Sequence, residues 1–269
     1  MIVLDKPGKV NLGELPTTAP AEVSRTDCEG TFKAMNKELA ELQELLFGAH
    51  EKSLLIVLQG RDAAGKDGTV KHVFGALNPR GVNIASFGVP TPREKSHDFL
   101  WRIHAQTPAR GEITIFNRSH YESVLVERVH NLTPKSVWKD RYAQINAFEH
   151  MLKAEGTIIL KFFLNISKGE QKQRLLEREA DPLKAYKLNA GDWEERELWK
   201  EFTAAYEEAL SKCATKEAPW VVVPGDDKWY RNYVVAETIA KALRPYRDDW
   251  RATLTEQSKQ VRKTLKNFH

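Results

Sequence analysis

Residues 54–69, LLIVLQGRDAAGKDGT, constrain the fold of this chain more than any other segment. The segment begins with a continuous apolar run, which is typical of a strand buried on both faces in a parallel sheet. Gly60, four further residues and then Gly65 and Lys66 follow, which is the spacing of a phosphate-binding loop. In such a loop, backbone N–H groups and the start of a helix surround an anion, and the lysine adds a positive charge. The segment therefore predicts a phosphate-binding α/β protein.

The loop departs from the usual motif at the residue after the lysine. Asp67 replaces the Ser or Thr whose hydroxyl usually holds Mg²⁺, and a second acid, Asp62, lies inside the loop. A carboxylate beside bound phosphates is repelled unless a cation lies between them, and Mg²⁺ prefers carboxylate oxygens. We expect Asp62 to bind Mg²⁺, or Mn²⁺ in its place, and Asp67 to interact with the helix dipole. The predicted phosphate-binding residues of the loop are Gly60, Arg61, Ala63, Ala64, Gly65, Lys66, Asp67, Gly68 and Thr69.

Strand-like and helix-like segments alternate along most of the chain. Such alternation implies a parallel sheet with helices on both faces. Apolar runs predict strands at 54–59, 83–87, 112–116, 157–166 and 220–224. Helical spacing of apolar residues predicts helices at 29–48, 66–78, 93–105, 119–128, 135–154, 168–179, 193–212 and 230–243.

The length and composition indicate a cytoplasmic protein with one large domain. We expect an irregular N-terminal arm over residues 1–28, the domain over 29–247 and a charged, peripheral tail over 248–269. No apolar run approaches the roughly 18 residues that span a membrane, and residues 1–20 lack the extended apolar core of a secretory signal. The two cysteines, Cys28 and Cys213, lie far apart and match no metal-ligand spacing. They indicate a reducing compartment.

A second group of polar residues directly follows the predicted strand at 112–116. Ligands of open parallel sheets bind beyond the carboxyl ends of the strands, where this group lies. Asn117 occupies the place of a Walker B aspartate, and Arg118 has the planar fork that matches phosphate oxygens. Glu122 lies one helical turn further and is expected to face the same cleft. His120 and Tyr121 are interpreted as packing residues.

A third group combines a helix with the polar loop that follows it. Arg174 and Arg178 share one helical face, and Lys184 and Lys187 follow in the loop. We interpret residues 168–192 as a mobile lid that supplies cations to a transferring phosphoryl group. The basic residues of loop and lid suit a polyanionic ligand, although the net charge is only +4.

Four ordered motifs resemble the polyphosphate kinase 2 family. They are GRDAAGKDG, FNRSHYE, FFLNIS with a later ER, and APW followed by DDKWYRN, and the resemblance covers residues from about 30 to 245. It implies a three-layer, thymidylate-kinase-like P-loop kinase fold with a helical lid. It also implies Mg²⁺-dependent phosphoryl transfer between inorganic polyphosphate and nucleotides, and a homodimer or homotetramer.

The resemblance also implies roles for single residues. Asp62 matches the metal-binding acid of the family, Lys66 its phosphate-bridging lysine, and Arg118 and Arg178 its arginines after the second motif and in the lid. Many relatives have Asp at the position of Asn117, followed by Ser-Trp-Tyr-Asn. The version in this chain resembles the subgroup called class III, which phosphorylates nucleoside mono- and diphosphates. Because an amide is a poor Mg²⁺ ligand, we expect Glu122 to compensate as a metal ligand.

The expected function is reversible phosphoryl transfer from polyphosphate to AMP and ADP, with adenine and also guanine nucleotides as acceptors. An ATP-dependent nucleoside monophosphate kinase is the alternative with the same fold. A non-catalytic P-loop module that binds nucleotides or nucleic acid is an alternative of another class. The basic residues are not interleaved with an aromatic stacking platform, so nucleic acid and membranes are not expected partners.

Overall fold

The computed structural model describes residues 2–187 and 189–266, with residues 184, 185 and 187 described in their backbone only. Its centre is a six-stranded sheet with the order β1-β6-β5-β2-β4-β3. All neighbouring strands are parallel except β1, which pairs antiparallel with β6. The strands are β1 (Ile2–Leu4), β2 (Ser53–Gln59), β3 (Val82–Ser86), β4 (Ile113–Asn117), β5 (Thr157–Asn165) and β6 (Trp220–Pro224).

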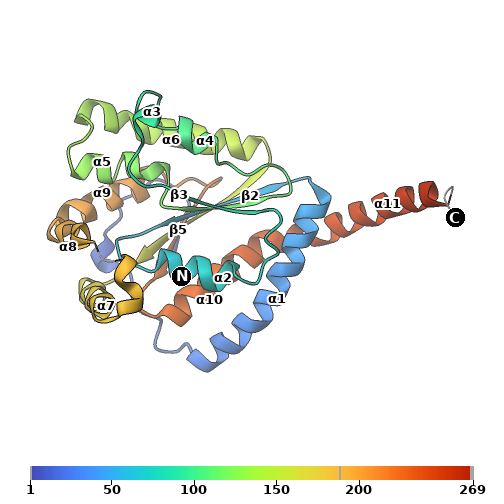
Figure 1. Cartoon of the computed structure of the whole chain (residues 1–269), viewed down its shortest axis with the longest axis horizontal. Helices are drawn as coiled ribbons and strands as arrows, with labels where there is room; N and C mark the ends of the chain where they lie inside the picture. The colour runs from blue at the N-terminus through green and yellow to red at the C-terminus, as the bar shows by residue number, and fades with distance from the viewer. Residues whose placement is uncertain (1, 188, 267–269) are drawn as a thin grey trace.

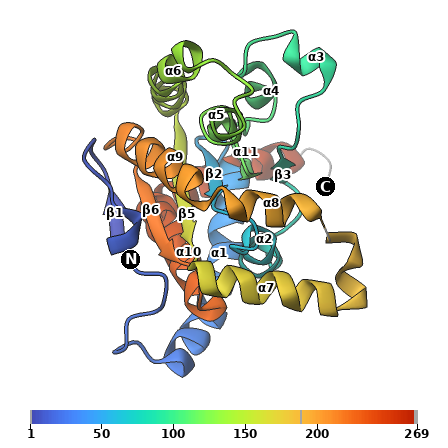
Figure 2. The same ribbon diagram turned by 90° about the vertical axis from the view of Figure 1, so that its left-hand side faces the viewer.

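Helices cover both faces of this sheet (Figures 1 and 2). Alternate residues of β2 point to opposite faces and enter two separate apolar cores. Residues of α1, α2, α10 and α11 pack in one core, and residues of α4, α6 and α9 in the other, which confirms the predicted α/β architecture. The helices are α1 (Arg25–Ala49), α2 (Lys66–Phe74), α3 (Pro92–Lys95), α4 (Trp101–His104), α5 (Val126–Val129), α6 (Lys135–Ala154), α7 (Lys168–Ala180), α8 (Ala190–Glu197), α9 (Trp199–Lys212), α10 (Lys228–Leu243) and α11 (Arg247–Leu265).

The two ends of the chain contribute more to the domain than expected. Part of the arm predicted to be irregular forms β1 and extends the sheet at its β6 edge. The tail predicted to be peripheral forms α11, in which Trp250 is fully buried beside α1. The sequence pattern underestimated this tail because one large aromatic side chain, rather than a periodic apolar stripe, anchors it. Beyond residue 254 the described part of α11 is exposed and projects from the body (Figure 1).

Three predicted helices are interrupted in the structure. Residues 93–105 form α3 and α4 separated by a turn, in which the Asp98 carboxylate accepts the Leu100 N–H and so competes with helical bonding. The segment 119–128 forms a 3₁₀ turn, His120–Ser123, before the short α5. Residues 193–212 divide into α8 and α9 at Leu198. None of the helices in the described part of the chain combines the length and apolar character needed to cross a bilayer.

Candidate active site

The loop after β2 has the backbone of a phosphate-binding loop. Gly65 has a φ of 104°, and a side chain there would collide with the guanidinium of Arg231. Helix α2 starts at Lys66, whose Nζ donates to the carbonyls of Gly60 at 2.7 Å and Arg61 at 3.1 Å. Burial, followed by the nearby Arg118, lowers the pKa of the Lys66 ammonium. The lysine therefore lies folded over the loop.

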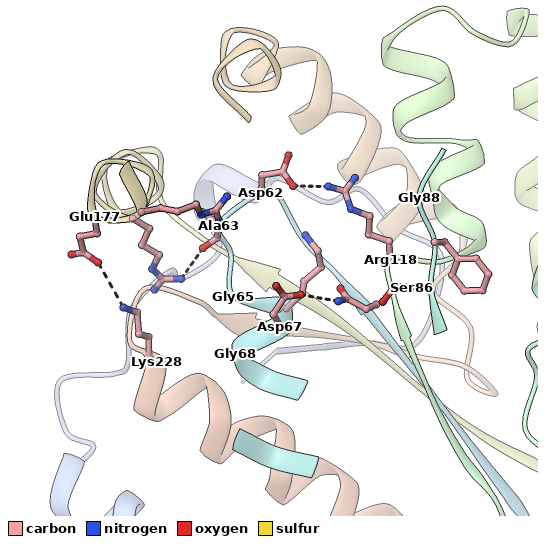
Figure 3. A pocket seen from close by; sticks show the side chains of 15 residues that line it. Asp62, Ala63, Gly65, Asp67, Gly68, Ser86, Gly88, Arg118, Glu177 and Lys228 are labelled. Carbon is pink, nitrogen blue, oxygen red and sulfur yellow. Dashed lines mark hydrogen bonds and ion pairs between the residues drawn. The ribbon is translucent and has the colours of Figure 1, made fainter. Parts of the chain in front are cut away.

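A cleft of about 540 Å³ opens above this loop (Figure 3). The loop, the ends of β3 and β4, helix α7 and the start of α10 form its walls. It brings together most of the residues that the sequence predicted from three separate segments. The cleft is lined by Asp62, Ala63, Gly65, Lys66, Asp67, Gly68, Ser86, Phe87, Gly88, Asn117, Arg118, Arg174, Glu177, Arg178 and Lys228.

Arg118 lies between the two acids that were predicted to bind metal. Its Nη2 donates to Asp62 Oδ1 at 2.6 Å, and its Nη1 lies 3.6 Å from Glu122 Oε2. Burial opposes the charged form, but Glu122 and Asp62 outweigh it and raise the pKa of the Arg118 guanidinium. The residue has a φ of 64°, a left-handed conformation that non-glycine residues rarely adopt. Such local strain is typical of functional sites.

Asn117 and Asp67 meet across the cleft floor. The Asn117 Nδ2 donates to Asp67 Oδ1 at 2.8 Å (Figure 3). Asp67 lies in the first turn of α2, where its charge is also favourable to the helix dipole, as expected. Asp67 thus fixes the side chain of Asn117, which occupies the Walker B position.

Glu195 is a site residue that the sequence interpretation missed. It lies on α8, and its carboxyl group shares a hydrogen bond with Asp62. Burial, followed by the charge of Asp62, raises the pKa of Glu195 to about 8. For Asp62, burial raises the pKa, but Lys66 and Arg118 outweigh it and lower the pKa overall. The only signal in the sequence is that Glu195 follows Asp192 by three residues on one helical face.

Arg178 connects the two helices of the predicted lid. Its guanidinium pairs with Asp192 of α8, and the side chain lines the cleft. The backbones of Lys184 and Lys187 lie in a 3₁₀ helix, Pro182–Lys187, but their side chains are outside the described part of the structure.

Lys228 is a basic residue of the cleft lining that was not predicted as a site residue. This lysine is the first residue of α10 and lies 4.0 Å from Glu177 of α7 at the cleft wall (Figure 3). It follows Asp227 in the APW…DDKWYRN motif, whose position next to β6 was the available signal.

Arg174 does not act as the mobile phosphate-binding residue that the sequence predicted. Its five N–H donors contact Glu170 and the backbone carbonyls of Ala63, Ala64, Gly225 and Asp226. An arginine has five donors in all, so none remains for a phosphate in this arrangement. Arg174 instead holds the phosphate-binding loop against the turn after β6.

Arg61 also differs from the prediction that it binds phosphate. Its guanidinium stacks on Trp199 at 3.8 Å and donates to the Trp199 carbonyl and the Thr203 hydroxyl. Burial lowers the pKa of Arg61 to about 10. The side chain therefore fastens the loop to α9 and is absent from the cleft lining.

The acids around Arg118 have the chemistry of a Mg²⁺ site. Two carboxylates, Asp62 and Glu122, already converge on one cationic group, and both offer hard oxygen donors. Among residues 2–187 and 189–266, no three His, Cys, Asp or Glu residues are grouped to hold a metal ion. Mg²⁺ usually binds through one or two carboxylates and substrate phosphates, so the donor set fits a metal that arrives with its substrate.

Comparisons with known proteins identify the family. The family model described as Polyphosphate kinase 2 matches residues 22–249. The chain is 53% identical over 209 residues to the AMP/ADP-polyphosphate phosphotransferase of Meiothermus ruber, covering 78% of each protein. It is 38% identical over 266 residues to an ADP-polyphosphate phosphotransferase of Rhodopseudomonas palustris, covering 94% of this chain and 92% of that protein.

A solved structure extends the agreement to the fold. The crystal structure of polyphosphate kinase 2 from Arthrobacter aurescens matches with a TM-score of 0.85 and 43% identity, over 89% of this chain and 87% of that chain. The region matched by the family model, residues 22–249, contains the phosphate-binding loop and strands β2 to β6. The chain belongs to the polyphosphate kinase 2 family.

Proposed function

We propose that this chain transfers the terminal phosphoryl group of inorganic polyphosphate to AMP and to ADP. The observation that carries the proposal is the convergence of Lys66, Arg118 and Arg178 on one cleft from three different elements. Phosphoryl transfer requires mainly alignment and neutralisation of developing charge, which such cations supply. The names of the relatives from Meiothermus ruber and Rhodopseudomonas palustris support polyphosphate with AMP or ADP as the substrates.

The transfer is direct in this proposal. A terminal phosphate oxygen of the nucleotide forms a bond to the last phosphorus of the polyphosphate, and the bridging P–O bond of that phosphorus breaks. The shortened polyphosphate leaves with the bonding electrons. The reaction is reversible because one phosphoanhydride bond is broken and another is formed. Lys66 and Arg118 hold the transferring group, and Arg178 reaches it from α7. Asp62 and Glu122 would hold Mg²⁺, which supplies further charge neutralisation on the phosphates.

The decisive assay combines the protein with ADP, polyphosphate and Mg²⁺ without another phosphate donor. We expect ATP to form, and ADP to form when AMP is the acceptor. Formation of ADP only from AMP and ATP would instead support an ATP-dependent nucleoside monophosphate kinase. Guanine nucleotides are proposed as further acceptors and are compared in the same assay. A homodimer or homotetramer is also proposed, and sedimentation of the protein tests it.

Replacing Asp62 with asparagine is expected to weaken metal binding by about tenfold or more, because it removes a charged oxygen ligand. Mn²⁺ binding in the presence of polyphosphate, followed by electron paramagnetic resonance, measures this without an activity assay. Asp140→Asn is the matched control, since Asp140 is exposed on α6 and does not line the cleft. Equal Mn²⁺ affinity in the Asp62→Asn variant and in the unaltered protein would remove Asp62 from the metal site.

Polyphosphate affinity is expected to fall steeply as salt increases, and more for long chains than for pyrophosphate. The cations Lys66, Arg118, Arg178 and Lys228 line the cleft, and a longer chain contacts more of them. Added salt screens each contact over a Debye length of about 10 Å at 0.1 M. Calorimetric titrations at several KCl concentrations measure the two slopes. Equal slopes for long chains and pyrophosphate would contradict a basic channel that extends beyond the reacting phosphate.

A further inference from the structure

A buried ion pair lies beneath the candidate active site and does not belong to the cleft. Lys161 of β5 and Glu149 of α6 have side chains exposed by only 0% and 2%, and their charged atoms lie 2.6 Å apart. Taking such a pair out of water costs free energy that an apolar pair would avoid. Its presence in the core therefore calls for a reason other than stability.

The pair has nearly all of its hydrogen-bonding capacity engaged. The Lys161 ammonium donates to Glu149 Oε2, to Tyr121 Oη at 2.9 Å and to the Cys213 carbonyl at 2.7 Å, which uses its three donors. Tyr121 Oη in turn donates to Glu149 Oε1 at 2.8 Å. We call Lys161, Glu149, Tyr121 and His120 the buried network.

His120 joins the buried network through one ring nitrogen. Its Nε2 lies 3.1 Å from Glu149 Oε1, and its Nδ1 is buried without a hydrogen-bond partner. Burial lowers the pKa of the His120 imidazole. The His120 ring packs edge-on against Phe148, and Glu149 is the hydrogen-bond partner recorded for its side chain.

The buried network holds the 3₁₀ turn, His120–Ser123, that follows Arg118 in the chain. Tyr121 and His120 belong to the 3₁₀ turn immediately after Arg118 and point into the core, where Tyr121 also packs edge-on against Trp220. Glu122 lies in the same turn and points the other way, toward Arg118. Fixing the two inward side chains therefore fixes the direction of the two outward ones.

We propose that the buried network positions Arg118 and Glu122 for phosphoryl transfer. Tyr121, His120, Glu149 and Lys161 are positioning residues in this proposal, since none of them lines the cleft. The inference rests on the proposed function, because Arg118 is taken as the group that contacts the transferring phosphoryl. The left-handed backbone of Arg118 requires such support, because strained conformations persist only where their surroundings fix them.

Tyr121→Phe tests the proposal with a small change. It removes the hydroxyl that links the turn to Lys161 and Glu149, while the ring packing and the ion pair remain. We expect kcat to fall about tenfold, because small displacements of catalytic groups are costly, and KM to change less than about twofold. The double variant Ser53→Ala with Thr157→Val is the matched control. It removes another buried hydrogen bond, which joins the first residues of β2 and β5.

Two further measurements separate positioning from general stability. In an Arg118→Ala background, Tyr121→Phe should cost less than about twofold in kcat, because residues that act through one group are not additive. Amide exchange over residues 117–123 of the ligand-free protein should become faster in Tyr121→Phe and stay unchanged in the control.

Unchanged kcat in a folded Tyr121→Phe variant, or the same loss in both Arg118 backgrounds, would overturn the proposal. Lys161→Met with Glu149→Leu provides a second variant that leaves no lone buried charge and should lower kcat further. The exchange experiment needs no substrate. Suppose that exchange is faster in Tyr121→Phe but the unaltered protein is inactive on polyphosphate. That result would contradict the proposed function, while the structural support of the turn by the buried network would stand.

Discussion

Lys66→Ala is expected to lower kcat by about 10²-fold or more, because it removes the positive charge nearest to the transferring phosphoryl group. The ammonium lies over the loop at the start of α2, where backbone N–H groups would surround a bound phosphate. The variant should fold, since the lost contacts are two hydrogen bonds to loop carbonyls, each worth about 1 kcal/mol in unfolding free energy. Steady-state kinetics with ADP and polyphosphate, together with thermal unfolding, measure both effects.

Lys71→Ala is the matched control for this experiment. Lys71 lies on the same helix, α2, but its side chain is exposed and outside the cleft lining. The Lys71→Ala variant should therefore have a kcat within about twofold of that of the unaltered protein, because surface substitutions usually have small effects. A folded Lys66→Ala variant with near-normal turnover would show that the loop lysine does not contact the reacting phosphate.

Local sequence patterns were sufficient to predict five of the six strands and the phosphate-binding loop. Buried parallel strands are continuous apolar runs, and the loop has a fixed spacing, so neither depends on distant contacts. For this reason β2, β4, β5 and β6 agree with their predicted segments to within one residue at each end. The boundaries of α6, Lys135–Ala154, are those that its apolar spacing predicted.

Tertiary contacts decided what the sequence could not predict. Arg174 and Arg61 follow the pattern of phosphate-binding cations, but carbonyls of the turn after β6 and an aromatic ring of α9 engage them. In the sequence, Glu195 resembles an ordinary surface acid of a helix. Folding brings it beside Asp62, which precedes it by more than 130 residues in the chain. Glu149, the buried hydrogen-bond partner of Tyr121, could not be distinguished in the sequence from other acids of an amphipathic helix.

Glu122→Asn is expected to reduce phosphorylation of AMP far more than that of ADP. A monophosphate is one phosphoryl group shorter than a diphosphate, so its reacting oxygen lies farther from the loop. A carboxylate can bridge this gap by holding a metal or an ordered water near the acceptor phosphate. In the structure, the carboxylate is suitably fixed: Glu122 Oε1 accepts from Gln59 Nε2 at 3.1 Å, and Oε2 faces Arg118.

The same geometry defines the competing role, in which Glu122 only orients Arg118. That arginine would serve both acceptors, so its displacement would reduce kcat/KM for AMP and ADP by the same factor. The acceptor-length role instead predicts a loss for AMP that exceeds the loss for ADP by about tenfold, or roughly 1.4 kcal/mol of transition-state stabilisation. Glu122→Gln separates length from charge, because it keeps the acceptor oxygen for Gln59 and the full side-chain length while removing the carboxylate. A selective loss for AMP in both variants would assign the effect to the charge, whereas a selective loss only in Glu122→Asn would assign it to reach. Equal losses for AMP and ADP in both variants would show that Glu122 acts through Arg118 alone.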